Sequence, residues 1–345
     1  MKRIGAALLL AFSLAANAAP LDRWPAPARA SIEQAIAGAP AGSYAVFDAD
    51  NTIWRHDLEE ALLPFLENKG TLSVATLDSA LKPVPLNAGE SLYGYYLRLC
   101  EIDDRVCYPW IAQVFAGRSL AALKRDVDAL MESHEPIPVR FAQGGKTISG
   151  FVSPPEIYPQ QRALIGELRS RGIRIYVVTA AAEELVRMVV SDPRYGLDVP
   201  PGDVIGVTML LRDPADGSVS TARKRIAEGH FLDPAYPAAR HATMILTPTL
   251  WSPLSWYEGK VAAIQAYIDP VRRPLLVAGD SRSDWAMLFH SDGLRLWVDK
   301  NAATTAALAR ERRQRADAET ALKLPAPLGA DRNWIIVTPA VLAVP

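Results

Sequence analysis

Histidine, an excess of basic charge and long apolar segments are scarce or lacking in this chain of 345 residues, and each scarcity argues against a class of site or partner. The five histidines show neither an HExxH pattern nor paired ligand spacing, which argues against a zinc site built from histidine. The formal net charge is −1, so there is no basic excess with which to hold a nucleic acid. Past the N-terminus no segment is long and apolar enough to span a membrane. Half of the residues are hydrophobic and 22% are charged, which is a globular composition.

Cysteine is equally scarce, with only Cys100 and Cys107. In an oxidising compartment the two could form a disulfide. On one continuous helix their Cα atoms would lie about 10 Å apart, which is too far to bridge. A disulfide therefore requires a break in the helix near "EIDDR", and at this point both the paired and the free state stay open.

The N-terminus has the features of a secretory signal peptide. Lys2 and Arg3 precede the apolar run "IGAALLLAFSLAA" and the small residues "ANA". The run is shorter than the roughly 20 residues that cross a bilayer, so no stable membrane anchor is expected. We predict that residues 1–18 are a signal peptide, removed after Ala18, and that the mature chain is periplasmic or secreted. Without Lys2 and Arg3 its formal net charge would be −3 rather than −1.

The pattern of apolar residues predicts an α/β fold. A first strand, "YAVFDAD", begins at Tyr44, and helical spacing then dominates, interrupted by a predicted hairpin that turns at Gly144 and Gly145. From residue 154 helices alternate with apolar strands, chiefly "IRIYVVTA", "DVIGVTML", "RPLLVAGD" and "LRLWVD". Such alternation is typical of a doubly wound parallel sheet covered on both faces, which the first strand would join. The proline-spaced tail is expected to run along the surface, with room for one more strand.

These elements divide the chain into a core and an insertion. We expect residues 19–57 and 154–345 to form the core, and residues 58–153 to form a mainly helical cap between its first and second strands. A cap in that position would close the ligand site of the sheet from water.

Polar side chains occur where the predicted strands end. Asp48 ends the first strand, Thr179 ends "IRIYVVT" and Asp280 ends "PLLVAGD". Lys260 begins a helix, and Asp284 follows four residues after Asp280. Because ligands of doubly wound sheets bind beyond the carboxyl ends of the strands, we expect these five side chains to converge. Several carboxylates with one ammonium and one hydroxyl suit a divalent cation and an anionic substrate.

In this order the motifs resemble those of the haloacid dehalogenase-like hydrolases. "DADNT" at 48–52 matches the DxDxT motif of that superfamily, and the threonine, lysine and "GDSRSD" motifs follow in family order. The resemblance covers the whole chain after the predicted signal peptide. It implies a Rossmann-like core with an inserted cap, and hydrolysis of a phosphomonoester through an aspartyl-phosphate.

The first two aspartates suit the catalytic roles that the resemblance implies. A carboxylate is ionised at neutral pH, so Asp48 needs no base in order to attack phosphorus. Asp50 points to the same side of the strand, where it can protonate the leaving oxygen and later deprotonate the attacking water. For this it must hold a proton near neutral pH, and clustering raises the pKa of one carboxylate.

The resemblance also implies a metal site and a phosphate site. The implied metal ligands are Asp48, the backbone carbonyl of Asp50 and Asp280, with Asp284 further out, orienting Lys260 or a metal-bound water. Oxygen ligands accept Mg²⁺, Mn²⁺ or Zn²⁺, and Mg²⁺ is the expected ion. The implied phosphate-binding residues are Asn51, Thr52, Thr179 and Lys260, although Thr52 is expected mainly to shape the backbone.

Longer stretches resemble a narrower family, the secreted bacterial phosphorylcholine phosphatases. These stretches are "GSYAVFDADNT", "DLEEALLPFLENKG", "LCEIDDRVCYPW" and "EELVRMVVSDPRYG". The resemblance implies phosphocholine as the small-molecule substrate, and its trimethylammonium group calls for aromatic faces and carboxylates. The candidates are Trp54, Glu101, Asp103 and Asp104, with Tyr93, Tyr95, Tyr96, Tyr108 and Trp110 nearby in the cap. Several of these aromatic residues also have the spacing of a helix face that packs inside the cap.

Two alternatives remain at this point. One is a broad-specificity periplasmic acid phosphatase on the same core, which would hydrolyse phosphocholine, phosphoethanolamine and p-nitrophenyl phosphate equally well. The other is a non-catalytic protein that binds choline-type ligands. The set of Asp48, Asp50, Lys260 and Asp280 argues against the second alternative, because binding alone does not need a nucleophile.

Overall fold

The structure is a computed structural model that describes residues 21–229, 236–323 and 329–344. The predicted signal peptide, residues 1–18, lies outside the described residues. Within these three ranges, no helix is both long and apolar enough to cross a bilayer.

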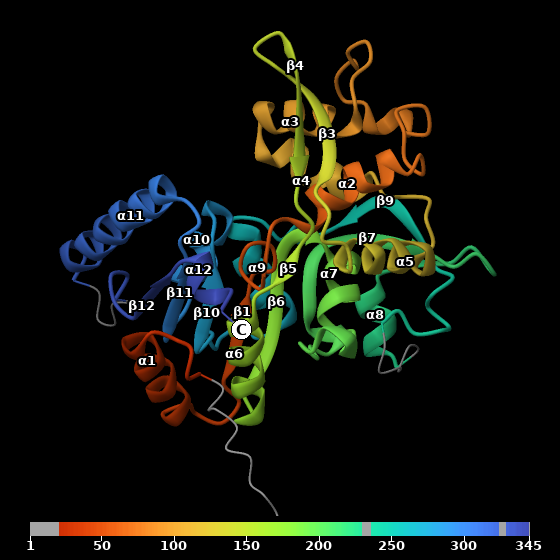
Figure 1. The fold of residues 1–345 in the computed structure, drawn as a ribbon. Coiled ribbons are helices and arrows are strands. Elements are labelled where there is room, and N and C mark those ends of the chain that lie inside the picture. The colour runs from red at the N-terminus through yellow and green to blue at the C-terminus, as the bar shows by residue number, and fades with distance from the viewer. Residues whose placement is uncertain (1–20, 230–235, 324–328, 345) are drawn as a thin grey trace, which may run out of the picture.

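A parallel sheet forms the centre of the molecule (Figure 1). The strands follow one another in the order β12-β11-β10-β1-β6-β7, and each neighbouring pair is parallel. Beyond them, β8 (Val219–Ser220) and β9 (Ile245–Trp251) pair antiparallel with β7. The predicted doubly wound parallel sheet is confirmed, and the first strand lies inside it. The parallel strands span Tyr44–Phe47 (β1), Arg174–Ala182 (β6), Val204–Arg212 (β7), Leu276–Gly279 (β10), Leu294–Val298 (β11) and Trp334–Val337 (β12).

The sheet is covered on both faces because alternate side chains of each strand enter different hydrophobic cores. On β1, Ala45 and Phe47 belong to one core, whereas Tyr44 and Val46 belong to the other. Burial on both faces explains the nearly unbroken apolar runs of these strands. The first core includes residues of α1 (Ala26–Ala37), α6 (Pro159–Ser170) and α7 (Glu183–Val190). The second includes residues of α9 (Glu258–Tyr267), α10 (Trp285–Phe289) and α11 (Ala302–Ala321).

Some elements were missed by the sequence analysis. Helix α11 was not predicted, since Ala307 and Leu308 are its only described buried residues and no apolar stripe marks it. Strand β9 contains Pro248 and lies at the edge of the sheet, where a proline is tolerated. The short helix α8 (Ala222–Ala227) was also missed. The tail contributes β12 and α12 (Pro339–Leu342), so it supplies the additional strand.

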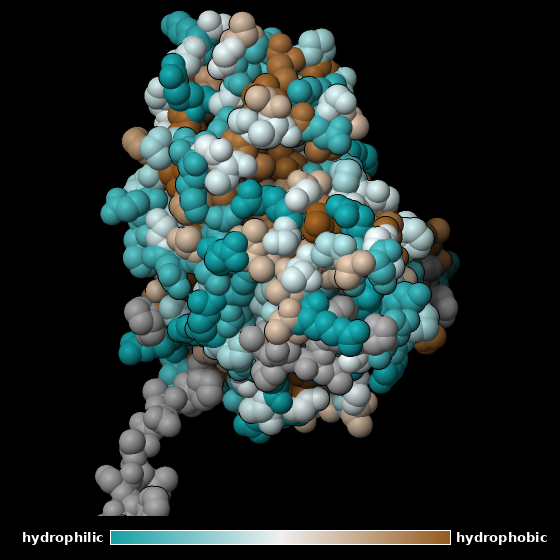
Figure 2. All heavy atoms as spheres, turned by 90° about the vertical axis from the view of Figure 1, so that its right-hand side faces the viewer, coloured by the Kyte–Doolittle hydropathy of each residue, from teal (hydrophilic) through white to brown (hydrophobic). Residues whose placement is uncertain are grey.

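The inserted segment rises above the carboxyl ends of the strands (Figure 1). It contains α2 (Leu58–Asn68), α3 (Leu92–Ile102), α4 (Asp104–Gln113), α5 (Leu120–Met131) and the hairpin of β3 (Ile137–Gln143) and β4 (Lys146–Val152). The predicted hairpin is confirmed, with φ of +57° at Gly144 and +75° at Gly145 in its turn. On the face shown in Figure 2, hydrophobic residues gather in the upper part of the molecule, where this segment lies.

The inserted segment is attached to the core at its base and at several points further along. At its base β2 (Trp54–Arg55) pairs with β5 (Glu156–Ile157). Further along, the N–H of Gly117 donates to the carbonyl of Leu246 over 2.8 Å, next to β9. Division of the chain at residues 57/58 and 153/154 stays a prediction.

A disulfide joins Cys100 to Cys107, and the helix break that it requires is present. Helix α3 ends at Ile102 and α4 begins at Asp104, while Asp103 between them is extended, with φ −172° and ψ 143°. The Cα atoms of the two cysteines are consequently 4.9 Å apart, instead of about 10 Å on a continuous helix. The pairing that the sequence left open is therefore settled.

We expect replacement of both cysteines by alanine to lower the free energy of unfolding by about 2–3 kcal/mol, because the disulfide closes a short loop. Urea denaturation with and without a thiol reductant measures this loss. The reductant should destabilise the parent chain by a similar amount and leave the double variant unchanged. An equal response of both proteins would contradict the expectation.

Candidate active site

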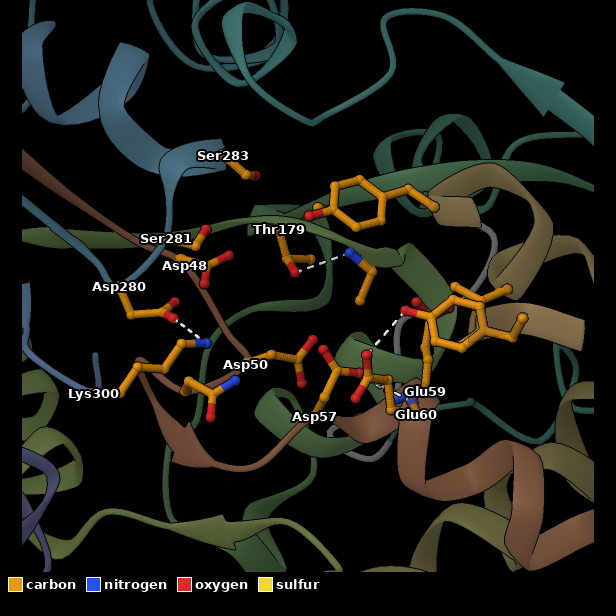
Figure 3. Close-up of a pocket in the computed structure, with 16 residues that line it drawn as sticks. Asp48, Asp50, Asp57, Glu59, Glu60, Thr179, Asp280, Ser281, Ser283 and Lys300 are labelled. Carbon is orange, nitrogen blue, oxygen red and sulfur yellow. Dashed lines mark hydrogen bonds and ion pairs between the residues drawn. The ribbon is translucent and has the colours of Figure 1, made fainter. Parts of the chain in front are cut away.

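Side chains that follow neighbouring parallel strands meet at one edge of the sheet (Figure 3). Asp48 directly follows β1 and Asp280 directly follows β10, while Thr179 lies in the second half of β6. All three are buried, with 6%, 2% and 1% of their surface exposed. Lys300 joins them from the end of β11. The convergence expected from the strand ends is therefore present in the structure.

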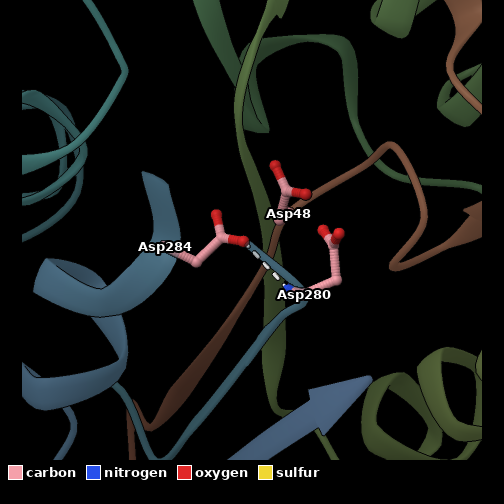
Figure 4. Close-up of side chains that lie close together, drawn as sticks. All are labelled: Asp48, Asp280 and Asp284. Atoms are coloured by element: carbon pink, nitrogen blue, oxygen red, sulfur yellow. Dashed lines mark hydrogen bonds between the residues drawn. The ribbon is translucent and has the colours of Figure 1, made fainter. Parts of the chain in front are cut away.

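Three aspartates form a compact cluster in this edge (Figure 4). Asp48, Asp280 and Asp284 each place a carboxylate oxygen within 4.8 Å of the others. One oxygen of Asp284 accepts hydrogen bonds from the backbone N–H groups of Asp280 and Ser281, each over 2.9 Å, and so holds the loop after β10. The hydroxyl of Thr52 lies 3.2 Å from Asp280 Oδ1 and 3.4 Å from Asp48 Oδ2. Thr52 thus fixes two of the carboxylates relative to each other.

Lys260 supplies the positive charge behind this cluster. Its Nζ lies 2.6 Å from Asp48 Oδ1 and 2.6 Å from Asp284 Oδ1, and the three side chains are buried. Burial alone would lower the pKa of Lys260, but Asp284 and Asp48 outweigh it and hold that pKa above its ordinary value. Gly259 permits this placement, since a Cβ there would lie 1.8 Å from the carbonyl oxygen of Leu254.

The cluster has the donor chemistry of a site for a divalent cation. Both oxygens of Asp284 are engaged, one with Lys260 and the other with the loop after β10. Asp48 and Asp280 line the cavity and Asp284 does not, so the first two are the carboxylates that an ion in the cavity would reach, and Asp284 supports them from behind. Burial raises the pKa of Asp280 to about 6, against the effect of Lys300. An all-oxygen donor set of this kind suits a hard cation.

Asp50 lies beside the cluster and is held by one oxygen only. Its Oδ1 accepts hydrogen bonds from the indole N–H of Trp54 over 2.7 Å and from the backbone N–H of Leu58 over 2.8 Å. Burial raises the pKa of Asp50 well above its ordinary value, and the charge of Asp57 adds to that effect. The direction of this shift favours the protonated form of Asp50, and burial contributes more to it than the clustering on which the sequence analysis relied.

A cavity of about 230 Å³ opens in front of these side chains (Figure 3). At one end lie Asp48, Asp280 and Lys300, and at the other lie Glu59 and Glu60, in the first turn of α2 (Figure 3). The full lining consists of Asp48, Asp50, Asn51, Asp57, Glu59, Glu60, Tyr96, Tyr108, Ile111, Thr179, Ala180, Ala181, Asp280, Ser281, Ser283 and Lys300.

The cap end of the cavity is acidic and aromatic. Glu59 accepts a hydrogen bond from the N–H of Ala182 over 2.9 Å, and this bond connects the first turn of α2 with the segment after Thr179. Glu60 accepts one from the hydroxyl of Tyr96 over 3.0 Å. Burial raises the pKa of Glu60 to about 7, and the neighbouring Asp57 adds to the shift. Glu60 is therefore close to the balance between the neutral and the anionic form at physiological pH. Burial also raises the pKa of Glu59 above its ordinary value, and the charge of Asp57 adds to that effect.

Several predicted site residues do not line the cavity. Trp54 is fully buried and serves to hold Asp50. Glu101 is exposed, Asp103 caps α4 and Asp104 accepts a hydrogen bond from the hydroxyl of Tyr257, so none of the three reaches the cavity. Of the cap aromatics that were considered, Tyr96 and Tyr108 line the cavity, whereas Tyr93, Tyr95 and Trp110 do not. Thr52, Lys260 and Asp284 support the cavity from behind its wall.

The sequence did carry signals for the lining residues that were missed. Glu59 lies on the same helix face as the buried Leu62, Leu63 and Leu66, and a carboxylate on a buried face is unusual. Lys300 comes two residues after the last residue of β11, where the strand-end rule would have found it. Ser281 and Ser283 lie within the "GDSRSD" motif, and Asp57 is the first residue of the "DLEEALLPFLENKG" stretch.

Comparison with known proteins gives one strong match. No protein-family model matches the chain. The chain is 49% identical over 348 aligned positions to phosphorylcholine phosphatase of Pseudomonas aeruginosa, and the match covers 98% of both proteins. Relatedness at this level and over this length establishes membership of a family.

Two solved structures share the fold at low identity. A conserved protein of unknown function from Anaerococcus prevotii is 18% identical, with a TM-score of 0.57 over 84% of this chain and 90% of that protein. A protein of unknown function from Bordetella pertussis is 13% identical, with a TM-score of 0.50 over 79% of this chain and 97% of that protein. The motif order, the parallel sheet and the full-length relative agree with one another, and the chain belongs to the phosphorylcholine phosphatase family of haloacid dehalogenase-like hydrolases.

Proposed function

We propose that this chain hydrolyses phosphocholine to choline and inorganic phosphate, through an aspartyl-phosphate on Asp48 and with Mg²⁺ as the expected cation. The observation that carries the proposal is the polarity of the cavity. One end brings together Asp48, Asp280 and Lys300, which suits a phosphoryl group with its cation, and the other end presents Glu59 and Glu60. Phosphocholine carries a negative phosphoryl group at one end and a positive trimethylammonium group at the other, which is complementary to the two ends of the cavity. The P. aeruginosa relative is named for this substrate.

Asp48 is the proposed nucleophile. Burial raises its pKa, with a contribution from Asp284, and the adjacent Lys260 ammonium opposes that effect. A divalent cation held by Asp48, the carbonyl of Asp50 and Asp280 would add positive charge, which favours the carboxylate and neutralises the phosphoryl oxygens. A carboxylate oxygen of Asp48 then attacks phosphorus, and the bond between phosphorus and the choline oxygen breaks.

Asp50 is the proposed general acid and base. Its raised pKa lets it hold the proton that the departing choline oxygen takes up. The resulting carboxylate accepts a proton from the water that attacks the phosphorus of aspartyl-phosphate. Inorganic phosphate leaves, and Asp48 and the protonated Asp50 are restored. The hydrogen bonds from Trp54 and Leu58 hold Asp50 in place during both transfers.

The trimethylammonium group is proposed to lie between Glu59, Glu60, Tyr96 and Tyr108. A quaternary ammonium cannot donate an ordinary hydrogen bond, so it is recognised by negative charge and by aromatic faces, at about 0.5–2 kcal/mol for each cation–π contact. The carboxyl groups of this subsite lie on α2, and the tyrosines lie on α3 and α4 of the same inserted segment. They take over the role that the sequence analysis gave to Glu101, Asp103 and Asp104.

The disulfide agrees with the proposed location. Disulfides persist in the periplasm and outside the cell and are rare in a reducing cytosol. The bond between Cys100 and Cys107 therefore supports export of the chain, and cleavage after Ala18 stays a prediction.

We expect Asp48→Asn to lower kcat by roughly a factor of 1,000 or more, because an amide is a far poorer nucleophile than a carboxylate. Choline lies at the other end of the cavity, so its dissociation constant, measured by calorimetry, should change less than about twofold. A parent chain without phosphatase activity that binds choline as well as the variant would instead support the non-catalytic binding protein.

We expect the KM for phosphocholine to fall as the pH rises from 6 to 8, because Glu60 loses its proton around pH 7 and only its anion attracts the ammonium group. The KM for p-nitrophenyl phosphate should not show this fall, because that substrate has no cationic group. Glu60→Gln should abolish the fall for phosphocholine and raise the KM for phosphocholine about tenfold.

Glu101→Gln is the matched control for Glu60→Gln, since it removes a carboxylate from the cap outside the cavity. Its kinetic constants should equal those of the parent chain. Equal kcat/KM for phosphocholine, phosphoethanolamine and p-nitrophenyl phosphate in the parent would show a broad-specificity phosphatase and contradict the proposed headgroup subsite.

A further inference from the structure

We propose that Lys300 is a second phosphoryl-binding residue and therefore a catalytic residue that no sequence motif identifies. The inference rests on the proposed function and extends it. Lys300 binds the phosphoryl oxygens that face the cavity, while Lys260 holds Asp48 from behind the cavity wall.

The placement of Lys300 is fixed by the backbone around it. The N–H of Asp299 donates to the carbonyl of Val337 in β12 over 2.7 Å, and the N–H of Lys300 donates to the carbonyl of Val298 over 3.0 Å. The carboxylate of Asp299 accepts a hydrogen bond from Thr305 over 2.7 Å, which joins it to α11. This turn therefore presents Lys300 at the same sheet edge as Asp48 and Asp280.

The balance of charge in the cavity favours such a residue, in addition to the proposed Mg²⁺. The carboxyl groups of Asp48, Asp50, Asp57, Glu59, Glu60 and Asp280 line the cavity, and among the described residues of the lining Lys300 is the only cation. Lys260 does not line it, and its ammonium group is held by two buried carboxylates. A phosphomonoester dianion that enters next to so many carboxylates is strongly disfavoured unless fixed positive charge faces it.

Lys300 has the freedom to take up this role. Its side chain is 37% exposed and forms an ion pair with Asp280 Oδ2 at 2.5 Å, whereas the Lys260 side chain is only 1% exposed. An ammonium group has three N–H donors, so contact with Asp280 leaves donors for phosphoryl oxygens. As charge spreads over those oxygens in the transition state, a cation at this position stabilises them.

Calorimetric titration of the Mg²⁺-loaded protein with inorganic phosphate tests the proposal without any turnover. Lys300→Gln should weaken phosphate binding at least about tenfold, and Lys300→Arg should restore much of it. Choline binding should change less than about twofold, since choline lies at the other end of the cavity. Unchanged phosphate binding in Lys300→Gln would overturn the proposal.

Lys69→Gln is the matched control. Lys69 also pairs with one aspartate, Asp126, at 2.9 Å, and its side chain is 43% exposed, but it does not line the cavity. This variant should bind phosphate as the parent chain does. If it weakened phosphate binding as much as Lys300→Gln, the loss would reflect general destabilisation and the proposal would fail.

A titration with Mn²⁺, followed by electron paramagnetic resonance, separates direct contact from an effect through Asp280. If Lys300 contacts the phosphate directly, Lys300→Gln should bind Mn²⁺ as tightly as the parent chain or more tightly. The reason is that the Lys300 ammonium no longer competes with Mn²⁺ for Asp280. A loss of Mn²⁺ affinity that matches the loss of phosphate affinity would mean that Lys300 only positions Asp280, which overturns the proposal. If the parent chain binds phosphate but not choline, the phosphocholine assignment fails, and the phosphate and Mn²⁺ measurements still decide the role of Lys300.

Discussion

The ion chain from Asp48 through Lys260 to Asp284 is the interaction on which the rest of the site depends. It joins the ends of β1 and β10 to the start of α9, segments that lie more than 200 residues apart at their extremes. Removing one partner of a buried ion pair leaves an uncompensated charge, which typically costs about 3–5 kcal/mol. The fold can therefore hold a buried carboxylate ready for attack only because the sheet brings these three segments to one edge.

A second constraint follows from the accumulation of acid groups beyond that ion chain. Among the described lining residues, the only cation is Lys300, and it lies at the opposite end of the cavity from Glu59 and Glu60. Such a cavity favours a ligand that is itself divided into an anionic and a cationic part. The same arrangement explains why the proposed headgroup subsite and the proposed phosphoryl subsite can be tested separately, since they lie on different elements.

The sequence predicted the core of this protein well because its signals are local. Asp48, Thr179 and Asp280 were found from one rule, that ligands bind at the carboxyl ends of parallel strands, and the same rule would have found Lys300 had the turn after β11 been considered. Helix α11 escaped because it buries few residues, and helical periodicity depends on burial. From the sequence, the disulfide was possible only if the helix broke near Asp103. The structure shows that break.

The cap residues were harder to predict for a physical reason. Periodicity identifies a helix face that is buried, and it does not say whether that face meets the cap core or a cavity. Tyr95 and Tyr96 are adjacent on α3 and both buried, yet Tyr96 reaches the cavity and Tyr95 donates a hydrogen bond to the carbonyl of Val84. Glu59 and Glu60 were read as part of an amphipathic helix, because their approach to the cavity depends on how α2 crosses the core.

The most direct test of this account is a single turnover of phosphocholine, quenched in acid within milliseconds and followed by peptide mass spectrometry. The account predicts that one phosphate appears on Asp48 and disappears as inorganic phosphate is released. Product formation while the peptide containing Asp48 stays free of phosphate at every time point, or carries it on another side chain, would contradict the account.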